Sequence, residues 1–267
     1  MCKREKLLIA HECPLSIMKL IDQYTDYSYA LVHLFEKFPS YLEFFKKALA
    51  NDREVILDNS LFELREMFDP ANFASWIEQI RPTYYVIPDV WEKATQTIES
   101  CRKWITFYSG LPGKTIGVVQ ATTYKEAVEC YKYLVEVVDK VAFNFENCVY
   151  SSLFPHPNKR ISLANGRLYL ISRMLEEGII NTNKPHHLLG VNLPQEVLYY
   201  KDMKFFDSID TSNPVVHGLK EIHYFEYGLL SKEEIKLADL IAVEPTAEQI
   251  SVIIQNISRF RRWVKGI

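Results

Sequence analysis

The sequence lacks cysteines at the spacings that zinc sites and disulfide frameworks use. No two of its five cysteines are closer than eleven residues, so no C-x-x-C pair exists among Cys2, Cys13, Cys101, Cys130 and Cys148. An odd number of cysteines without a pairing framework is typical of a reducing compartment. We therefore expect a cytoplasmic protein that holds no metal and no cofactor.

Long apolar runs and an excess of basic charge are also missing. No segment approaches the roughly 20 apolar residues that a membrane-spanning helix needs, and the apolar run at 7–10 is too short for a signal peptide. With 31 Lys and Arg against 34 Asp and Glu, the formal charge is −3 at pH 7. This balance gives no global sign of nucleic-acid binding, although a local basic stripe could still provide it. We expect a soluble protein with no membrane segment.

Short β-rich runs alternate with longer amphipathic stretches along the chain. Strands are expected at 6–10, 54–58, 83–89, 114–120, 140–144, 186–191 and 204–209, with a weaker candidate at 239–243 that could equally be helical. Such alternation indicates a parallel sheet with crossover connections. Seven or eight repeats favour an α/β fold of the (β/α)8 TIM-type barrel class, as a single domain over residues 1–267. The first strand is not followed by G-x-G-x-x-G, which disfavours a dinucleotide-binding sheet.

Helix signals fill the intervals between these strands. Asp69 reads as an N-cap with Pro70 at the first helical position, and Thr122 or Thr123 caps another helix. A further helix is expected to begin at Asn165 or Gly166. The expected helices cover 70–80, 91–108, about 123–138, about 165–177, 194–201 and about 246–264.

Most of these strands are expected to end at or beside polar residues. The residues at these ends are Asp58, Asp89, Gln120, Asn144 with Phe145, Gly190 with Asn192, and Asp207. Because active sites of barrel enzymes lie at the carboxyl ends of the strands, three carboxylates and a carboxamide should converge on one mouth. The alternative is that each acid only caps the next helix, but that interpretation leaves Gln120 without a role.

The order of these segments resembles the tRNA-guanine transglycosylase family. The resemblance runs from about residue 54 to 218 and rests on VILDNSLFE (55–63), YVIPD (85–89), GVVQ (117–120), HLLGV (187–191) and FFDSIDTSNPVVHG (205–218). Each motif alone is weak, and their shared order gives the resemblance its specificity. It implies a barrel enzyme that exchanges guanine in a nucleic acid for a 7-deazaguanine through a covalent sugar–enzyme intermediate.

The resemblance also assigns catalytic roles. Cleavage of an N-glycosidic bond builds positive charge on the sugar, so a carboxylate can attack C1′ and hold the intermediate. By the resemblance that nucleophile is Asp207, and Asp58 is the general acid and base for the leaving and entering bases.

Base recognition is implied by the remaining motif residues. Asp89 would accept from the N1–H and 2-amino groups of the base, and the Gln120 amide would donate to O6 and N7. The ring would stack between Phe62 and Leu189. The neighbouring base-binding positions are Phe145 and Gly190.

Departures from the family pattern affect the expected substrate. The family's zinc motif is absent, Ser60 and Leu61 replace two glycines, and Asn213 and Val216 replace arginines after the nucleophile motif. These changes favour the compact branch that modifies DNA rather than tRNA and is often phage-encoded, which would place the protein in the host cytoplasm. The target base would have to be flipped out of a duplex. The entering base would be preQ0-like, and a homodimer or a partner protein fits the resemblance.

Other functions remain alternatives to DNA base exchange. They are a tRNA-guanine transglycosylase, a base-releasing N-glycosidase and a barrel subunit that binds nucleic acid without turnover. Candidate backbone contacts are Lys159 and Arg160 in one loop, and Arg259, Arg261 and Arg262 near the end of the chain. Either group could instead be an ordinary solvated surface.

Overall fold

Eight parallel strands form one sheet that nearly closes into a barrel. The structure is a computed structural model that describes residues 7–191, 193–224 and 237–265. The strands are β1 (Leu8–His11), β2 (Ser28–Leu31), β3 (Val55–Asp58), β4 (Tyr84–Val86), β5 (Lys114–Val119), β6 (Lys140–Phe143), β7 (His186–Leu188) and β8 (Phe206–Thr211). Their order is β1-β8-β7-β6-β5-β4-β3-β2, so β1 and β2 are the two edges. These edges meet where the Asp26 amide donates to the Ile9 carbonyl at 2.8 Å. The expected (β/α)8 barrel is confirmed.

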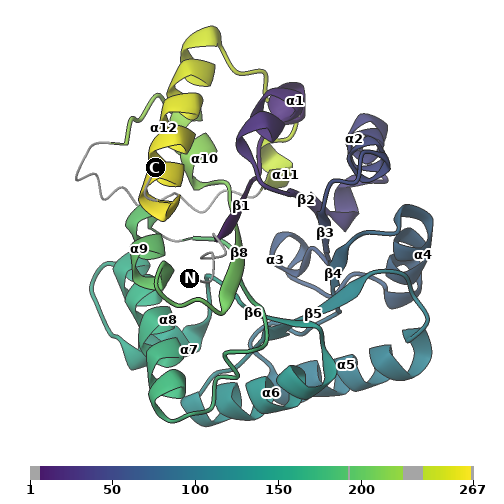
Figure 1. The fold of residues 1–267 in the computed structure, drawn as a ribbon, viewed down its shortest axis with the longest axis vertical. Coiled ribbons are helices and arrows are strands. Elements are labelled where there is room, and N and C mark those ends of the chain that lie inside the picture. The colour runs from purple at the N-terminus through teal and green to yellow at the C-terminus, as the bar shows by residue number, and fades with distance from the viewer. Residues whose placement is uncertain (1–6, 192, 225–236, 266–267) are drawn as a thin grey trace, which may run out of the picture.

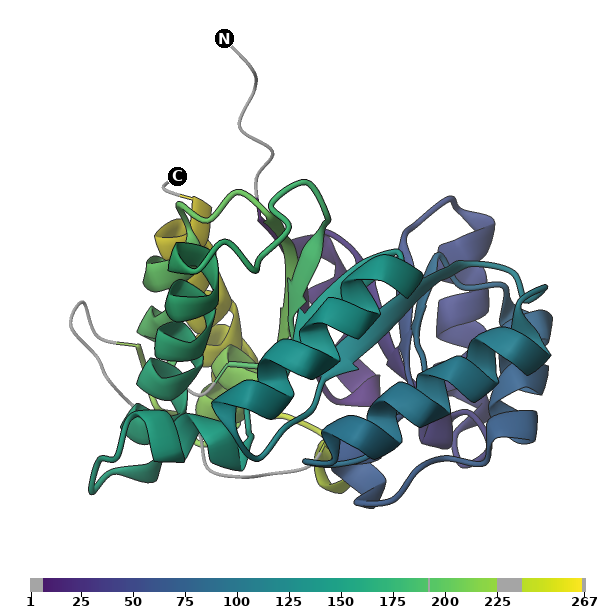
Figure 2. The ribbon, with the colours of Figure 1, turned by 90° about the horizontal axis from the view of Figure 1, so that it is seen from below.

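Helices surround this sheet on the outside, except the short α3, which lies towards the interior beside β3 (Figure 1). They are α1 (Met18–Ile21), α2 (Pro39–Ala50), α3 (Leu61–Leu64), α4 (Pro70–Ile80), α5 (Ala94–Tyr108), α6 (Tyr124–Val137), α7 (Cys148–Leu153), α8 (Lys159–Glu176), α9 (Val197–Tyr200), α10 (Asn213–Leu219), α11 (Leu237–Leu240) and α12 (Ala247–Lys265). Short 3₁₀ turns occupy Leu15–Ile17, Asp22–Tyr24, Val32–Leu34 and Pro194–Glu196. Figure 2 shows α5 and α6 packed side by side across the outer face of the sheet. None of the described helices is long and apolar enough to cross a membrane.

Capping residues set several helix starts as the sequence predicts. The Asp69 side chain accepts from the Asn72 amide at 2.8 Å, with Pro70 in the first turn of α4. Thr123 and Glu126 form a reciprocal capping box at the start of α6. Both caps satisfy amides that the first helical turn leaves without a partner.

The predicted start of the long helix α8 is wrong by about six residues. Asn158 caps α8, because its side chain accepts from the amides of Arg160 and Ile161. Gly166 lies inside this helix, where α7 passes close by. A Cβ built on Gly166 would lie 2.1 Å from the Tyr150 carbonyl oxygen. The glycine therefore permits close helix packing and does not mark a helix start.

Two strand predictions also need correction. The eighth strand is β2, whose four residues Ser28–Leu31 are all buried and carry no alternation that would reveal them. The weak candidate at 239–243 begins inside α11 and then leaves regular structure. In addition, β8 starts at Phe206 and runs on to Thr211, two residues beyond the expected end. This last shift changes which acid reaches the mouth.

Candidate active site

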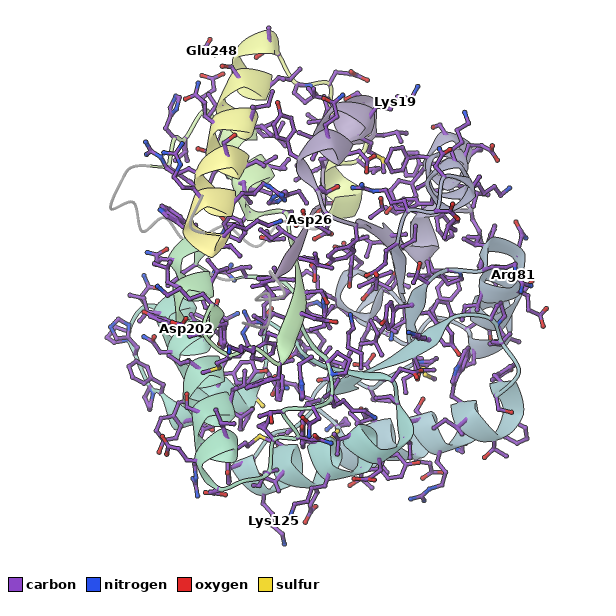
Figure 3. All side chains as sticks on the ribbon, in the orientation of Figure 1. Lys19, Asp26, Arg81, Lys125, Asp202 and Glu248 are labelled. Carbon is purple, nitrogen blue, oxygen red and sulfur yellow. The ribbon has the colours of Figure 1, made fainter. Side chains whose placement is uncertain are left out.

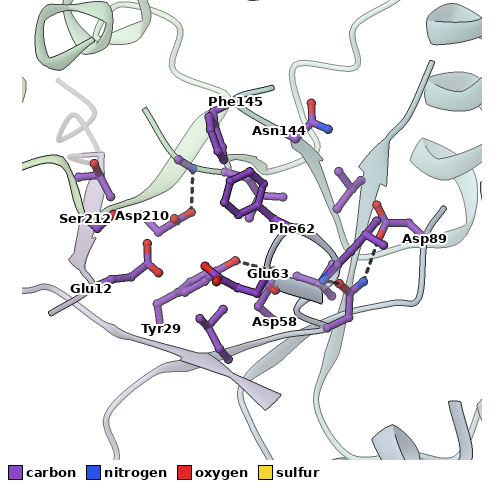
Figure 4. A pocket seen from close by; sticks show the side chains of 18 of the residues that line it. Glu12, Tyr29, Asp58, Phe62, Glu63, Asp89, Asn144, Phe145, Asp210 and Ser212 are labelled. Atoms are coloured by element: carbon purple, nitrogen blue, oxygen red, sulfur yellow. Dashed lines mark hydrogen bonds between the residues drawn. The ribbon is translucent and has the colours of Figure 1, made fainter. Parts of the chain in front are cut away.

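A pocket opens at the carboxyl ends of the strands, which we call the mouth. The space not filled by atoms is about 970 Å³, including solvent at the opening. Its polar and charged lining residues are Glu12, Tyr29, Asp58, Asn59, Glu63, Asp89, Gln120, Asn144, Arg160, Asp210, Thr211 and Ser212 (Figure 4). Asn192, which the sequence places near this end, lies outside the described residues.

Asp58, the last residue of β3, is held by two hydrogen bonds. Its carboxylate accepts from the Tyr29 hydroxyl at 2.7 Å and from the Ser60 amide at 2.6 Å. Ser60 itself has a left-handed backbone conformation, with φ of 64°. Burial raises the pKa of Asp58 to about 7, although both hydrogen bonds act in the opposite direction. A carboxyl group with this pKa can both donate and accept a proton near neutral pH.

Asp89 lies in a buried cluster of amide side chains. The Asn59 and Gln120 side-chain amides each donate to one of its oxygens, both at 2.7 Å. Gln120 in turn accepts from the Glu92 amide at 3.0 Å through Oε1. Burial raises the pKa of Asp89 to about 6, against the effect of the two side-chain hydrogen bonds. The cluster therefore holds the Asp89 carboxylate, a hydrogen-bond acceptor, in one orientation at the pocket. Asn59 is a member of the cluster that sequence reasoning missed.

Aromatic rings form one wall of the pocket. The rings of Phe62 and Phe145 meet edge to face, with centroids 4.8 Å apart, and Arg65 lies 4.4 Å from the Phe62 centroid and 4.7 Å from that of Trp91. Gly190, with φ of +65°, faces Phe145. A Cβ there would lie 2.6 Å from the ring. The wall therefore needs glycine at this position, and Leu189 lines the same pocket.

Asp207 is not at the mouth, so its expected position was wrong. It is the second residue of β8 and pairs with Lys140, the first residue of β6, at 2.9 Å. Both therefore lie at the opposite end of the barrel, which we call the amino end. Three residues at about 3.3 Å each separate Asp207 from Asp210 by roughly 10 Å along the strand. Asp210, not Asp207, lines the pocket.

Asp210 is buried and held by two neighbouring segments. One of its oxygens lies 3.0 Å from Nε2 of His187 and accepts from the Gly190 amide at 3.2 Å. The Gly190 carbonyl accepts from Arg167 at 3.0 Å, and Arg167 forms a fully buried ion pair with Glu196 at 2.6 Å. The buried Arg167–Glu196 pair therefore holds the loop after β7 in place. His187 and Arg167 are further members of the site that motif reasoning missed.

The predicted backbone contacts separate into two groups. Arg160 lines the pocket, and Lys159 beside it forms an ion pair with Glu146 at 2.6 Å. By contrast, Arg261 pairs with Asp26 at 2.9 Å beside the start of β1 (Figure 3). Arg259 donates to the Tyr224 carbonyl oxygen, and Arg262 lies nearby on α12. Only the first group is close to the mouth.

Comparison with known proteins gives no family assignment. No protein-family model matches the chain, and no curated protein matches it significantly. The resemblance to guanine transglycosylases therefore stays a prediction that rests on the motif residues.

Proposed function

We propose that this protein is a base-exchanging glycosyltransferase of the guanine transglycosylase type, with DNA as its substrate. The observation that carries the proposal is that one pocket holds two kinds of acid. Asp89 is embedded among amide side chains, as a reader of a purine edge would be, whereas Asp58 and Asp210 line the same pocket with a tyrosine hydroxyl, backbone amides and a histidine as their partners.

The chemistry assigns separate tasks to the last two carboxylates. Asp210 attacks C1′ of the sugar as the bond to guanine breaks, giving an aspartyl–sugar ester. Asp58 transfers its proton to the departing guanine. The entering 7-deazaguanine, preQ0-like, returns a proton to Asp58 as its nitrogen displaces the ester. No proton is gained or lost over the cycle, so a carboxyl group with a pKa of about 7 suits the step.

Base recognition uses the cluster around Asp89. Its carboxylate accepts from the N1–H and 2-amino groups of a guanine-like ring, and the Gln120 amide supplies a donor for O6 and N7. The cost of burying this acid is reduced by the Asn59 and Gln120 hydrogen bonds. Phe62 and Leu189 supply apolar surface for the ring faces. A base in a duplex would enter by flipping out of the stack.

Basic groups around the mouth support a polymeric substrate. Arg65, Lys159 and Arg160 all lie at this end, and Glu146 pairs with two of them, Arg65 at 3.8 Å and Lys159 at 2.6 Å. Such cations can follow a phosphate backbone. The choice of DNA over tRNA rests on the sequence departures described above.

Exchange of radiolabelled guanine tests this function directly. Duplex DNA, single-stranded DNA and tRNA carrying the label are each incubated with unlabelled guanine or a 7-deazaguanine, using wild type and Asp210→Ala. Loss of label with incorporation of the new base into DNA, by wild type only, is the expected result. Loss from tRNA would reverse the polymer assignment, and release without incorporation would indicate a glycosidase. Binding without release would indicate a non-catalytic subunit.

A further inference from the structure

A chain of hydrogen-bonding groups runs through the barrel from the mouth to the amino end. Nε2 of His187 lies 3.0 Å from Asp210, and Nδ1 lies 2.9 Å from the Ser208 hydroxyl. That hydroxyl lies 2.7 Å from Asp207 Oδ1, and Lys140 Nζ reaches both Ser208, at 3.1 Å, and Asp207 Oδ2, at 2.9 Å. All five groups are buried except Asp207, whose side chain is 32% exposed.

Counting the hydrogens along this series of hydrogen-bonding groups determines the protonation state of Nδ1 of His187. The Ser208 hydroxyl has a single proton, and two acceptors compete for it, Asp207 Oδ1 and His187 Nδ1. If it went to Nδ1, two lone pairs would face each other across 2.7 Å between Ser208 and Asp207. The arrangement is satisfied when Ser208 donates to Asp207 and accepts from both Lys140 and Nδ1–H of His187. Nδ1 therefore carries a proton.

The same count of hydrogens determines how many protons lie in the contact between His187 and Asp210. With Nδ1 protonated, their 3.0 Å contact needs one further proton, on either Nε2 or the carboxyl group. Either Asp210 is neutral beside a neutral imidazole, or an ionised Asp210 accepts from an imidazolium. The Gly190 amide also donates to this carboxylate oxygen, which favours the ionised form.

Other charged and titratable groups around His187 agree with a cation there. The Tyr29 ring stacks on the imidazole at 6.1 Å, and Tyr27 meets it edge-on at 6.5 Å. Glu54 interacts with it electrostatically from the amino end. The only cation among these neighbours, Lys140, is already paired with Asp207.

We propose that His187 is a positioning residue that takes the proton of Asp210 and holds this carboxylate ionised, with Ser208, Asp207 and Lys140 setting its protonation. The proton moves from the carboxyl oxygen to Nε2, giving a carboxylate and an imidazolium, and nothing else is consumed. The inference rests on the proposed function only for the role of Asp210 as nucleophile. It gives Asp207 a task at the amino end, as the acceptor that directs the Ser208 hydroxyl away from His187.

Nitrogen-15 NMR of the histidine rings tests the protonation state without any substrate. The His187 signals are assigned by their loss in His187→Gln, and His186→Gln serves as the matched control. The neighbouring His186 points to Tyr131 on α6, outside the barrel. We expect both His187 ring nitrogens to be protonated at pH 7.5 in wild type. Asp207→Asn should convert the ring to a neutral form, because its amide can donate to Ser208 and release the hydroxyl proton to Nδ1. An unprotonated Nδ1 in wild type would overturn the proposal.

Kinetics separate this proposal from the function it rests on. Gln at position 187 keeps a donor towards Asp210 but carries no charge, so the exchange step should slow by roughly tenfold or more. The KM for the entering base should stay unchanged, while the acid limb of the pH profile moves. Ser208→Ala repeats the test if His187→Gln does not fold. An imidazolium at His187 in a wild-type protein that exchanges no base in DNA or in tRNA would defeat the proposed function alone. Normal exchange and an unmoved pH profile in His187→Gln, where Asp210→Asn is inactive, would defeat the positioning role alone.

Discussion

The carboxylates at the two ends of the barrel have different kinds of hydrogen-bond and ion-pair partners. At the amino end, Asp207 pairs with Lys140, and Asp26 pairs with both Arg261 and Lys265. At the mouth, the hydrogen bonds to Asp58 and Asp89 come from a tyrosine hydroxyl, a backbone amide and two side-chain amides. Neutral donors satisfy these acids without fixing their charge.

This difference separates stability from function. Asp26, paired with two cations, has a pKa held below its ordinary value and stays charged, so it contributes mainly to stability. A buried acid with neutral partners costs folding energy when ionised, but its proton becomes available near neutral pH. Asp58 and Asp89 at the mouth therefore have the properties expected of groups that exchange protons, whereas Asp26 at the amino end has those of a structural acid.

The largest difference is expected between a variant that loses an acid at the mouth and a variant that loses one at the amino end. Asp210→Asn removes the proposed nucleophile and should slow base exchange by roughly 10³-fold or more, whereas Asp207→Asn should cost far less. Single-turnover rates and denaturing gels for a covalent protein–DNA adduct measure this. The control is that both variants keep the wild-type circular dichroism spectrum at the assay temperature, because Asp207→Asn leaves the buried Lys140 without its ion pair and should itself cost stability. A greater loss in Asp207→Asn than in Asp210→Asn would remove the distinction between the two ends.

The second prediction concerns stability against pH at the mouth. The pKa of Asp58 is about 7 in the folded protein against an ordinary 3.8, so folding binds its proton more tightly. The resulting stabilisation is full below about pH 4 and is lost as pH rises towards 7. Asp58→Asn removes this loss and should raise the free energy of unfolding at pH 8 by about 2–4 kcal/mol. Urea unfolding between pH 5 and 8 provides the measurement. A variant that is less stable than wild type at pH 8 would contradict it.

Local signals in the sequence were enough to predict several of the helix starts. Asp69 with Pro70 and Thr123 with Glu126 define helix starts through contacts within four residues. The strand β2 could not be found in this way, because Ser28–Leu31 is short and buried on all positions. Its place is determined by pairing with β3, a contact made across more than twenty residues.

The candidate site was only partly predictable for a similar reason. Asp58, Asp89 and Gln120 each end a strand or follow one closely, so the barrel rule brings them together. The expected position of Asp207 was wrong because FFDSID contains two acids three residues apart, and the end of the strand decides which of them reaches the mouth. Pairing of β8 with β1 continues to Thr211, which carries Asp210 rather than Asp207 to the mouth.

A third prediction tests the contribution of Asp26, at the amino end, to the stability of the fold. Burial raises the pKa of Asp26, but hydrogen bonds from Arg261, Lys265 and the Ile9 amide outweigh it and hold the pKa below its ordinary value. Asp26 therefore stabilises the fold above its unfolded pKa, and this contribution is lost as pH falls. Asp26→Asn should lower the free energy of unfolding at pH 7 by roughly 1–2 kcal/mol. The deficit should shrink below pH 4, in contrast to Asp58→Asn, and base exchange should be unchanged.

The smallest effect is expected for single cations that contact DNA. Arg160 lines the pocket, whereas Arg261 is bound to Asp26 at the other end. Arg160→Gln should weaken DNA binding a few-fold and reduce the slope of log Kd against log salt by about 1, because one phosphate contact is lost. Arg261→Gln is the matched control and should leave that slope unchanged. Fluorescence anisotropy over a salt series measures both. If Arg261→Gln changed the slope and Arg160→Gln did not, DNA would lie along α12, and the mouth would have to receive its base from a strand held at the opposite end. That route is much longer than a flipped nucleotide can span, so this outcome would count against base exchange in the pocket as well as against the backbone contact.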